Sequence, residues 1–468
     1  MVKEDLGNVI NVLDYGAVAD GVNDDSKAIN DAIEACAEEG GGTVYFGPGR
    51  YLTGPINLKS NVTLYLEEEA TILFSRNFDD YPLVETRREG IHLFQCSPLI
   101  FGKNLRNVAL RGKGVFDGQG DAWRPVVKAE VSEEEWRKLV ESGGVVDEDE
   151  EMWWPTSRAF EGKILMEKCK EEGRKPLREE CERVREFFRP QLLQLYNCED
   201  VVLDGPTFKN SPQWAVHIVY SRNVTVKNIR CLNPWNAANG DGLDIDSSRN
   251  VYVTGCYFDV GDDCVCLKSG RDEEGRKIGK PTENVTVENC IMRHGHGGIV
   301  IGSETSGGVR NLTVDNCIFD GTERGIRFKT KRGRGGVVEN ITISNIIMRN
   351  IMRQAIVFNM FYGERTTQMD IPPEPVSEET PIFRNIRISN VTCEGASSAI
   401  EILGLPEMPV KRVTLENIRI SAERGVTLQN CRGIRLIRVE VEAKRGPSLE
   451  CYGVEELELT DFRGKNRR

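Results

Sequence analysis

Four short segments in the middle of the chain carry the side chains best suited to chemistry: Asn239–Asp246, Gly261–Lys268, Gly295–Gly302 and Arg324–Lys329. Six of their side chains are expected to gather along one side of the structure: Asp241, Asp262, Asp263, His296, Arg327 and Lys329. Carboxylates that crowd together push their pKa values apart, so that one can stay protonated as an acid while another is ionised. The first hypothesis is therefore an acid–base site, and the alternative is a calcium site, which also uses carboxylates.

These segments need a regular framework to bring them together. In each one two apolar residues lie two positions apart, which is typical of a strand with one face turned inward. A second pattern recurs along the chain: four residues that alternate between apolar and polar, with a polar residue or glycine at each end. From Asn223 to Arg412 its starts lie 27, 34, 27, 29, 45 and 27 residues apart, mostly within the period range of solenoids.

The recurring pattern also contains a turn. Most copies end in Asn or Gly, the residues that most readily take positive φ, so the chain is expected to turn at the same place in every unit. The pattern predicts an all-β fold, a right-handed parallel β-helix, in which each coil buries its apolar side chains against its neighbours. Because neighbouring coils lie roughly 4.8 Å apart, the polar groups of the four segments can converge over two or three coils.

The rest of the chain is predicted to complete one domain over residues 1–468. Residues 10–54 include an amphipathic helix and are interpreted as an N-terminal cap with the first coil. Residues 122–190 interrupt the repeats with helical, charged sequence and are interpreted as an insertion. Residues 200–460 would then form the main coils that carry the active site. Three tryptophans of the insertion either stack on sugars or fill its core: Trp123, Trp153 and Trp154.

Composition limits the remaining possibilities. The chain is 39% hydrophobic and 29% charged and has no run of 18 apolar residues, so no membrane span is expected. The first nine residues lack a signal layout, which predicts a cytoplasmic protein, or a secreted one if a signal has been removed. The fourteen cysteines are interpreted as small apolar residues that are easier to tolerate in a reducing compartment. No cofactor, metal or nucleic-acid partner is expected.

The polar segments, taken in order, resemble the four signature motifs of the polygalacturonases, glycoside hydrolase family 28. The motifs are Asn239-Gly-Asp241, Gly261-Asp-Asp263, Gly295-His-Gly297 and Arg327-Phe-Lys329. Three further stretches resemble the bacterial exo-acting members: Thr86–Gly90, Ile301–Glu304 and Ser306–Arg310. Two positions depart from the family pattern, Gly240 where threonine is common and Phe328 where isoleucine is common.

The resemblance implies a role for each motif. Asp262 is expected to be the general acid, and Asp241 with Asp263 to hold the nucleophilic water of an inverting mechanism. His296 is expected to hydrogen-bond the acid and tune it. Arg327 and Lys329 are expected to bind the carboxylate of a galacturonate ring.

Further substrate contacts are predicted at Tyr362, His217, Asn239 and Lys268. For Tyr362 and His217 the alternative is a packed side chain without a role in binding. Net charge is −12, so binding of a polyanion requires a local basic pocket in an acidic body. The residues expected to form it are Lys268, Arg310, Arg327, Lys329 and Arg353.

The sequence thus predicts a glycosidase that hydrolyses α-1,4-linked galacturonic acid in polygalacturonate or oligogalacturonides. Exo action is expected because the insertion could wall off one end of an open groove. One alternative is a hydrolase of rhamnogalacturonan or another substituted pectin; the other is a carbohydrate-binding β-helix without catalysis. The sequence gives no expectation for the oligomeric state.

Overall fold

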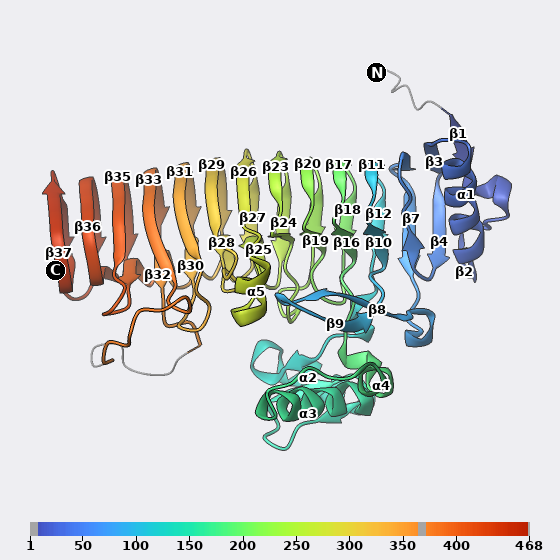
Figure 1. Cartoon of the computed structure of the whole chain (residues 1–468), viewed down its shortest axis with the longest axis horizontal. Coiled ribbons are helices and arrows are strands. Elements are labelled where there is room, and N and C mark those ends of the chain that lie inside the picture. The colour runs from blue at the N-terminus through green and yellow to red at the C-terminus, as the bar shows by residue number, and fades with distance from the viewer. Residues whose placement is uncertain (1–7, 364–370, 467–468) are drawn as a thin grey trace. The chain divides into compact units, whose positions relative to one another are not determined.

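The computed structural model describes residues 8–363 and 371–466 (Figure 1). Most of this part is β-structure, and strands of successive coils pair in parallel. The predicted right-handed parallel β-helix is confirmed. The described residues fall into two compact units: unit 1 comprises residues 8–88, 92–243 and 260–262, and unit 2 comprises residues 89–91, 244–259, 263–363 and 371–466. The prediction of a single domain stays a prediction.

Unit 1 begins with the predicted amphipathic helix, α1 (Ser26–Glu38), which buries one face. The buried side chains recur at helical spacing: Ala28, Ile29, Ala32, Ile33 and Cys36. They pack against β3 and β5 of the first coils, so α1 caps this part of the solenoid. The short strands around it are β1 (Val9–Asn11), β2 (Asp20–Asp24), β3 (Gly42–Phe46), β4 (Gly49–Thr53) and β5 (Ile56–Asn57).

The later coils of unit 1 are built on buried columns of apolar residues. Leu64, Leu110, Leu203 and Val226 occupy equivalent positions in four successive coils, and all are buried. Their strands alternate inward and outward residues, as the pattern predicts. The strands are β6 (Val62–Leu66), β7 (Ala70–Phe74), β10 (Ile100–Lys103), β11 (Arg106–Gly112), β12 (Val115–Asp117), β16 (Leu193–Tyr196), β17 (Glu199–Asp204), β18 (Thr207–Lys209), β19 (Val216–Val219), β20 (Arg222–Lys227) and β21 (Arg230–Leu232).

The insertion is partly helical, as predicted. It holds α2 (Glu133–Glu141), α3 (Ser157–Glu171) and α4 (Arg178–Arg183), together with a three-stranded antiparallel sheet of β13 (Val126–Val127), β14 (Val145–Val146) and β15 (Met152–Trp154). A hairpin, β8 (Leu83–Arg88) and β9 (Ile91–Cys96), precedes it. Trp123 is 1% exposed and packs edge-on against Phe78 with ring centroids 4.5 Å apart. Trp153 and Trp154 are buried too, so these three tryptophans are packing residues.

Unit 2 contains the coils that follow. Val265, Ile299, Ile326, Ile356 and Ile400 form one continuous buried column, which confirms the predicted inward positions. Its elements are β22 (Leu243–Asp246, whose first residue belongs to unit 1), β23 (Arg249–Thr254), β24 (Tyr257–Val260), β25 (Asp263–Lys268), α5 (Asp272–Ile278), β26 (Thr282–Glu288), β27 (Ile291–His294), β28 (Gly297–Ile301), β29 (Val309–Asp320), β30 (Ile326–Lys329), β31 (Val337–Arg349), β32 (Gln354–Asn359), β33 (Ile382–Glu394), β34 (Ser398–Leu403), β35 (Val410–Ala422), β36 (Arg424–Ala443), β37 (Leu449–Thr460) and β38 (Arg463–Asn466).

The turns occur where the repeats predict them. Asn residues that open and close the repeats have φ between 51° and 57°, the left-handed region that Asn tolerates. Their side chains also bond from coil to coil: Asn311 donates to Asn284 at 3.0 Å, and Asn284 donates to Asn250 at 3.1 Å. Phe328 points into the core and stacks on Phe358 with ring centroids 4.2 Å apart, so its departure from the family pattern is a matter of packing.

Two further expectations concern the whole chain. All fourteen cysteines lie in described residues; every one is a free thiol, and only Cys451 is exposed. In the stretches that the structure describes, no helix has the length and apolar character needed to cross a membrane.

Candidate active site

Asp241 of unit 1 follows a short loop, residues 233–240, and is 2% exposed. Its carbonyl oxygen accepts a hydrogen bond from the Ala215 amide at 2.9 Å. The loop is closed on itself, since Asn233 Nδ2 donates to the Gly240 carbonyl at 3.0 Å and the Gly240 amide donates to the Ala237 carbonyl at 2.8 Å. The backbone that carries Asp241 is therefore fixed from both sides.

Asn239, a predicted substrate contact, lies in this loop with φ 54°. Arg189 is buried and holds the loop through three hydrogen bonds. Its Nη2 donates to Asn239 Oδ1 at 2.9 Å, and its Nη1 donates to the carbonyls of Ala238 and Pro212, both at 2.8 Å. The structure thus gives the Asn239 side chain a positioning contact, and the predicted contact with substrate stays a prediction.

Two glycines of the motifs are required by close packing. A Cβ at Gly261 would lie 2.4 Å from the Pro234 carbonyl oxygen and 2.8 Å from the Ala237 amide nitrogen. A Cβ at Gly240 would lie 2.7 Å from the Ala237 Cβ, so a threonine does not fit this loop as it is folded. The loop of residues 233–240 therefore rests directly on Gly261, the residue before Asp262, which brings the first two motifs together.

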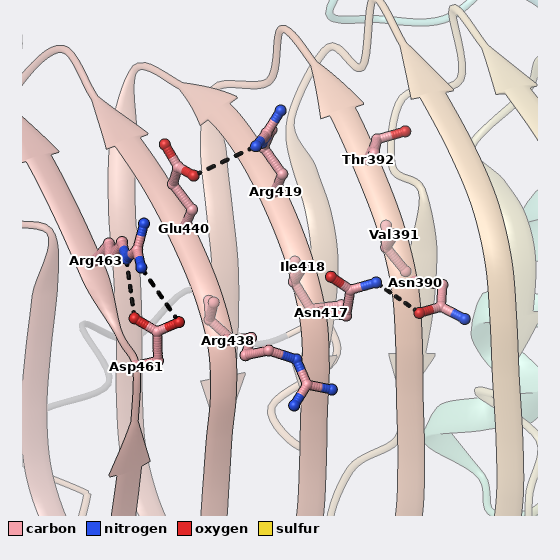
Figure 2. A pocket seen from close by; sticks show the side chains of 11 residues that line it. Asn390, Val391, Thr392, Asn417, Ile418, Arg419, Arg438, Glu440, Asp461 and Arg463 are labelled. Atoms are coloured by element: carbon pink, nitrogen blue, oxygen red, sulfur yellow. Dashed lines mark hydrogen bonds and ion pairs between the residues drawn. The ribbon is translucent and has the colours of Figure 1, made fainter.

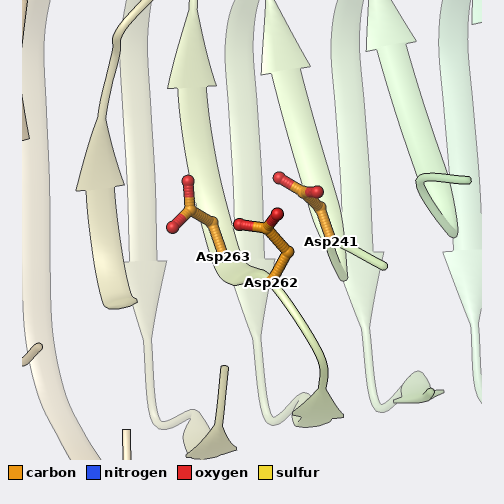
Figure 3. A group of neighbouring side chains, drawn as sticks. All are labelled: Asp241, Asp262 and Asp263. Atoms are coloured by element: carbon orange, nitrogen blue, oxygen red, sulfur yellow. The ribbon is translucent and has the colours of Figure 1, made fainter. Parts of the chain in front are cut away.

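The first two carboxylates of the site belong to unit 1. Asp241 and Asp262 each have a carboxylate oxygen within 4.8 Å of the other (Figure 3). Asp241 is buried, whereas Asp262 is half-buried. Asp263 is joined to Asp262 by a peptide bond and starts strand β25. The predicted trio is thus made of a pair in unit 1 and the residue that follows it in the chain.

Asp263 of unit 2 is 1% exposed and sits between two cations of strand β30. Lys329 Nζ donates to Asp263 Oδ2 at 2.7 Å, and Arg327 Nη1 donates to Oδ1 at 3.3 Å. Burial by itself would raise the pKa of Asp263, but the charges of Lys329, Arg327 and Lys268 outweigh it and hold that pKa well below its ordinary value. The two cations of β30 therefore favour the ionised form of Asp263.

Lys268, another predicted substrate contact, has a side chain that is only 5% exposed. Its Nζ lies 3.3 Å from Glu304 Oε2 and 3.5 Å from Asp244 Oδ1. Burial opposes the charge on Glu304, yet Lys268 and the neighbouring arginines lower its pKa to about 2. The structure shows Lys268 as the centre of a buried ion cluster, and a direct contact with substrate stays a prediction.

In unit 2, His296 lies at the same end of the strands as Asp263, next to Gly297, which pairs with Asp263; Tyr362 follows the other end of its strand, after Asn359, which pairs with Lys329. The Tyr362 ring is 5.2 Å from Lys329 Nζ and 5.7 Å from the Arg327 guanidinium carbon, within the range of cation–π contacts. Tyr362 is half-buried, and its amide donates to the Thr330 carbonyl at 3.0 Å. His296 immediately precedes strand β28 and is also half-buried. Both positions match the predicted neighbourhood, and the assigned roles stay predictions.

His217 of unit 1 is fully buried on strand β19. Its Nδ1 lies 3.0 Å from Gln194 Nε2, and its ring packs edge-on against Trp214 with centroids 4.8 Å apart. These contacts are those of the packed histidine that was the alternative to a sugar contact. The substrate role of His217 stays a prediction that would need this region to open.

Asp263 also offers carboxylate oxygens that a cation could use as ligands. Both oxygens of Asp263, however, already accept bonds from Lys329 and Arg327. Two adjacent positive charges disfavour a third. The arrangement fits acid–base chemistry with protein cations better than it fits a calcium site.

Trp235 lies in the loop before Asp241 and is not among the site residues predicted from the sequence. Its side chain is 65% exposed. The signal available in the sequence was an aromatic residue in the turn-forming stretch Pro234-Trp-Asn236, immediately before the first motif.

The chain is similar to known proteins in sequence. The sequence model of "Glycosyl hydrolases family 28" matches residues 171–443, and that of "Rhamnogalacturonase A/epimerase, pectate lyase-like" matches residues 9–131. A "Probable polygalacturonase" of Vitis vinifera is 29% identical over 464 residues, 96% of this chain and 82% of that protein. An "Exo-poly-alpha-D-galacturonosidase" of Dickeya chrysanthemi is 28% identical over 407 residues, 85% of this chain but only 64% of that protein.

The similarity extends to the three-dimensional structure. The crystal structure of a hyperthermoactive exopolygalacturonase from Thermotoga maritima matches 97% of this chain and 92% of its own, with a TM-score of 0.76 and 31% identity. The four motifs lie within the part matched by the first family model. The chain belongs to glycosyl hydrolases family 28.

Proposed function

We propose that this protein hydrolyses α-1,4-linked galacturonic acid in polygalacturonate or oligogalacturonides, by exo action. The observation that carries the proposal is the close pair Asp241 and Asp262 in a chain of family 28. Glycoside hydrolysis needs one carboxyl group to protonate the leaving oxygen and another to activate water or attack the sugar.

Asp262 is proposed as the general acid. It is the one half-buried member of the trio, so it can reach a bound substrate while Asp241 and Asp263 stay buried. Asp241 and Asp263 are proposed to hold the attacking water, and Asp263 suits this task because Lys329 and Arg327 keep it ionised. His296 is proposed to tune the acid through a hydrogen bond.

Arg327 and Lys329 are proposed to recognise the substrate carboxylate. Arg327 uses only Nη1 toward Asp263, and a guanidinium has five donors, so it can grip a second carboxylate at another edge. The Tyr362 ring lies within cation–π distance of both cations. A charged pocket of this kind favours galacturonate over neutral sugars.

Inversion at the anomeric carbon is proposed from the family resemblance. In general the two carboxyl groups lie about 6.5–9.5 Å apart in inverting glycosidases and about 5–5.5 Å apart in retaining ones. The oxygens of Asp241 and Asp262 approach within 4.8 Å, and this closest-atom distance does not separate the two outcomes. Proton NMR of the first product does: the β-anomer is expected before mutarotation, and the α-anomer would overturn inversion.

Exo action is proposed because the Dickeya and Thermotoga relatives bear exo-acting names, and because three stretches of this chain resemble exo-acting members. The second candidate function is a substituted-pectin hydrolase. It is favoured by the match of residues 9–131 to a rhamnogalacturonase A/epimerase-type model.

The test is to incubate the protein with galacturonic acid trimer and with long polygalacturonate, and to separate the products over time. Galacturonic acid alone from the earliest points is expected. A ladder of mid-sized oligomers would replace exo by endo action, and product only from a substituted pectin would favour the second candidate.

A variant pair ties the activity to the site. Asp262→Asn is expected to lower kcat by about 10²–10⁴, the range for loss of general acid catalysis, while trimer binding survives. Asp315→Asn, on the outer face of β29, is the matched control and should retain full activity. Equal losses in both variants would remove Asp262 from the mechanism.

We also propose a reducing compartment as the place of action. All fourteen thiols are free, and a chain with thirteen buried thiols is easier to keep in that state where disulfides do not persist. Fractionation of the native cells tests this: activity outside the cytoplasm would contradict it.

A further inference from the structure

Trp235 stands out among the six tryptophans, all of which lie in described residues. The other five are buried or half-buried, whereas the Trp235 side chain is 65% exposed. An indole is a large apolar surface, and burying it is favourable. Its exposure, in a loop that contacts Gly261, leaves this surface accessible to a ligand.

The loop presents Trp235 rigidly. The Ala237 amide donates to the Pro234 carbonyl at 2.9 Å, which closes a turn with Trp235 and Asn236 at its tip. Pro234 fixes one backbone dihedral angle beside it. Asn233 ties the base of the loop to Ser211 Oγ at 2.9 Å. Because the turn is closed and its base is tied, an occupant binds a preformed surface.

The same loop fixes where that surface lies. Pro234 and Ala237, on either side of the tip, are the residues in closest approach to Gly261. Gly261 precedes Asp262, and Gly240 at the end of the loop precedes Asp241. Trp235 thus belongs to a loop that contacts the residue before Asp262 and ends at the residue before Asp241.

The chemistry of the proposed substrate matches an indole. A galacturonate ring carries its 4-hydroxyl axially, which leaves C–H groups at positions 3, 4 and 5 together on one face. A flat aromatic ring packs well on such an apolar face, and the carboxylate and hydroxyls remain at the ring edge for polar contacts. Stacking on an uncharged indole also binds a charged sugar chain without adding charge to the site.

We infer that Trp235 is a stacking platform for a sugar ring of the galacturonan chain next to the scissile bond, and so a residue that determines affinity and specificity. The inference rests on the proposed function. Trp235 binds the substrate throughout the reaction and takes no part in proton transfer. Its loss is therefore expected to act on KM more than on kcat.

Kinetics with galacturonic acid trimer provide the first test. Trp235→Ala is expected to raise KM about tenfold with kcat within about threefold, and Trp235→Phe to recover most of the affinity because it keeps a flat ring. Trp136→Ala is the control, since Trp136 is a half-buried tryptophan of the insertion. Melting temperatures of the two Trp235 variants should stay close to that of the wild type, because Trp235 is exposed.

Fluorescence provides a readout that does not depend on turnover. In the Asp262→Asn background, trimer is expected to shift or quench tryptophan emission, and this signal should vanish in Asp262→Asn/Trp235→Phe. A KM within twofold of the wild type for Trp235→Ala, or an unchanged signal in the double variant, overturns the inference while the proposed function stands. An unchanged KM together with an altered oligomeric state would show that Trp235 meets a protein partner instead. If the wild type neither cleaves nor binds any galacturonide, the proposed function fails as well.

Discussion

Two charged regions of unit 2 are built from the same kinds of side chain and differ in burial. The inner cluster consists of Asp244, Asp263, Lys268, Glu304, Arg327 and Lys329, whose side chains are 0–12% exposed. The outer groove, with a volume of about 380 Å³, is lined by strands β33, β35, β36 and β38 (Figure 2). Its charged residues are Arg419, Arg438, Arg463, Glu440 and Asp461.

In the outer groove each exposed arginine has a carboxylate partner, and these carboxylates are 20–48% exposed. Arg463 Nε lies 2.9 Å from Asp461 Oδ1, and Arg419 Nη2 lies 3.6 Å from Glu440 Oε2. Arg438 Nη2 lies 2.5 Å from Glu416 Oε1. The arginine side chains are 55–76% exposed, so water and salt screen these pairs.

In the inner cluster water is excluded, and the same charges act strongly on one another. This is why the pKa of Asp263 is held low against its own burial. The presence of several arginines and carboxylates therefore does not by itself identify the site of this protein. Dehydration of those charges marks it, and the following predictions test that distinction.

The largest effect is expected from Lys329→Met. It removes the 2.7 Å partner of Asp263 and one of the two cations proposed for the substrate carboxylate. Losing one partner of a buried charge pair costs about 2–5 kcal/mol, so kcat/KM for galacturonic acid trimer should fall by about 30- to 5,000-fold. With burial less opposed, the pKa of Asp263 should rise, and the acid limb of the kcat/KM profile should move to higher pH.

The matched control for this variant is Lys444→Met. Lys444 forms an equally short pair, 2.7 Å from Glu423, but both side chains are more than 40% exposed. Its kcat/KM and pH profile should be those of the wild type. Similar losses in both variants would mean that burial does not separate the two regions.

Lys268→Met is expected to act on stability. Asp244 and Glu304 would remain buried without their shared cation, and breaking a buried pair in this way costs about 3–5 kcal/mol of the free energy of unfolding. Denaturant unfolding at pH 7 measures this. A loss below about 1 kcal/mol would place the cluster in the same class as exposed pairs.

The same variant has a pH signature. In the wild type the pKa of Glu304 is lowered from 4.5 to about 2, so its ionisation stabilises the fold above pH 4.5. That contribution is lost as the pH falls from 4.5 toward 2. The difference in stability between wild type and Lys268→Met should therefore shrink across this window, and a difference independent of pH would contradict the assignment.

Removal of divalent cations is expected to have a smaller effect. Lys329 and Arg327 already neutralise Asp263 from within the protein. Activity on galacturonic acid trimer should therefore change by less than about twofold after treatment with a chelator, because no metal charge is needed there. A loss that added calcium restores would instead support the metal-binding alternative.

The features that depend on a local sequence pattern could be predicted. Alternation predicted the buried column from Val265 to Ile326, and recurrent Asn predicted turns such as that at Asn284. The motif spacing predicted that Asp241 and Asp262 meet, because stacked coils bring equivalent positions of neighbouring coils together.

Burial of polar residues could not be predicted in the same way. Lys268 was expected at the substrate, yet it is enclosed by Asp244 and Glu304, and Glu304 comes from a loop outside the repeat. Trp235 was overlooked because a loop residue has no periodicity, whereas Trp123 drew attention and proved to be core. Such outcomes depend on how irregular segments fold over the regular coils, which alternation does not encode.

The smallest effect is expected in the outer groove. Arg419→Ala breaks the 3.6 Å pair with Glu440, which is itself 25% exposed, and an exposed pair of this kind contributes about 0–1 kcal/mol. The free energy of unfolding of Arg419→Ala should therefore differ from that of the wild type by less than about 1 kcal/mol. Its dependence on salt concentration should be as weak as in the wild type. kcat/KM for galacturonic acid trimer should not change, because the groove is expected to carry no substrate. A clear rise in KM for long polygalacturonate, with unchanged kinetics on the trimer, would show that the outer groove binds the distal part of the polymer. Exposure of the charged side chains would then no longer distinguish the outer groove from the site.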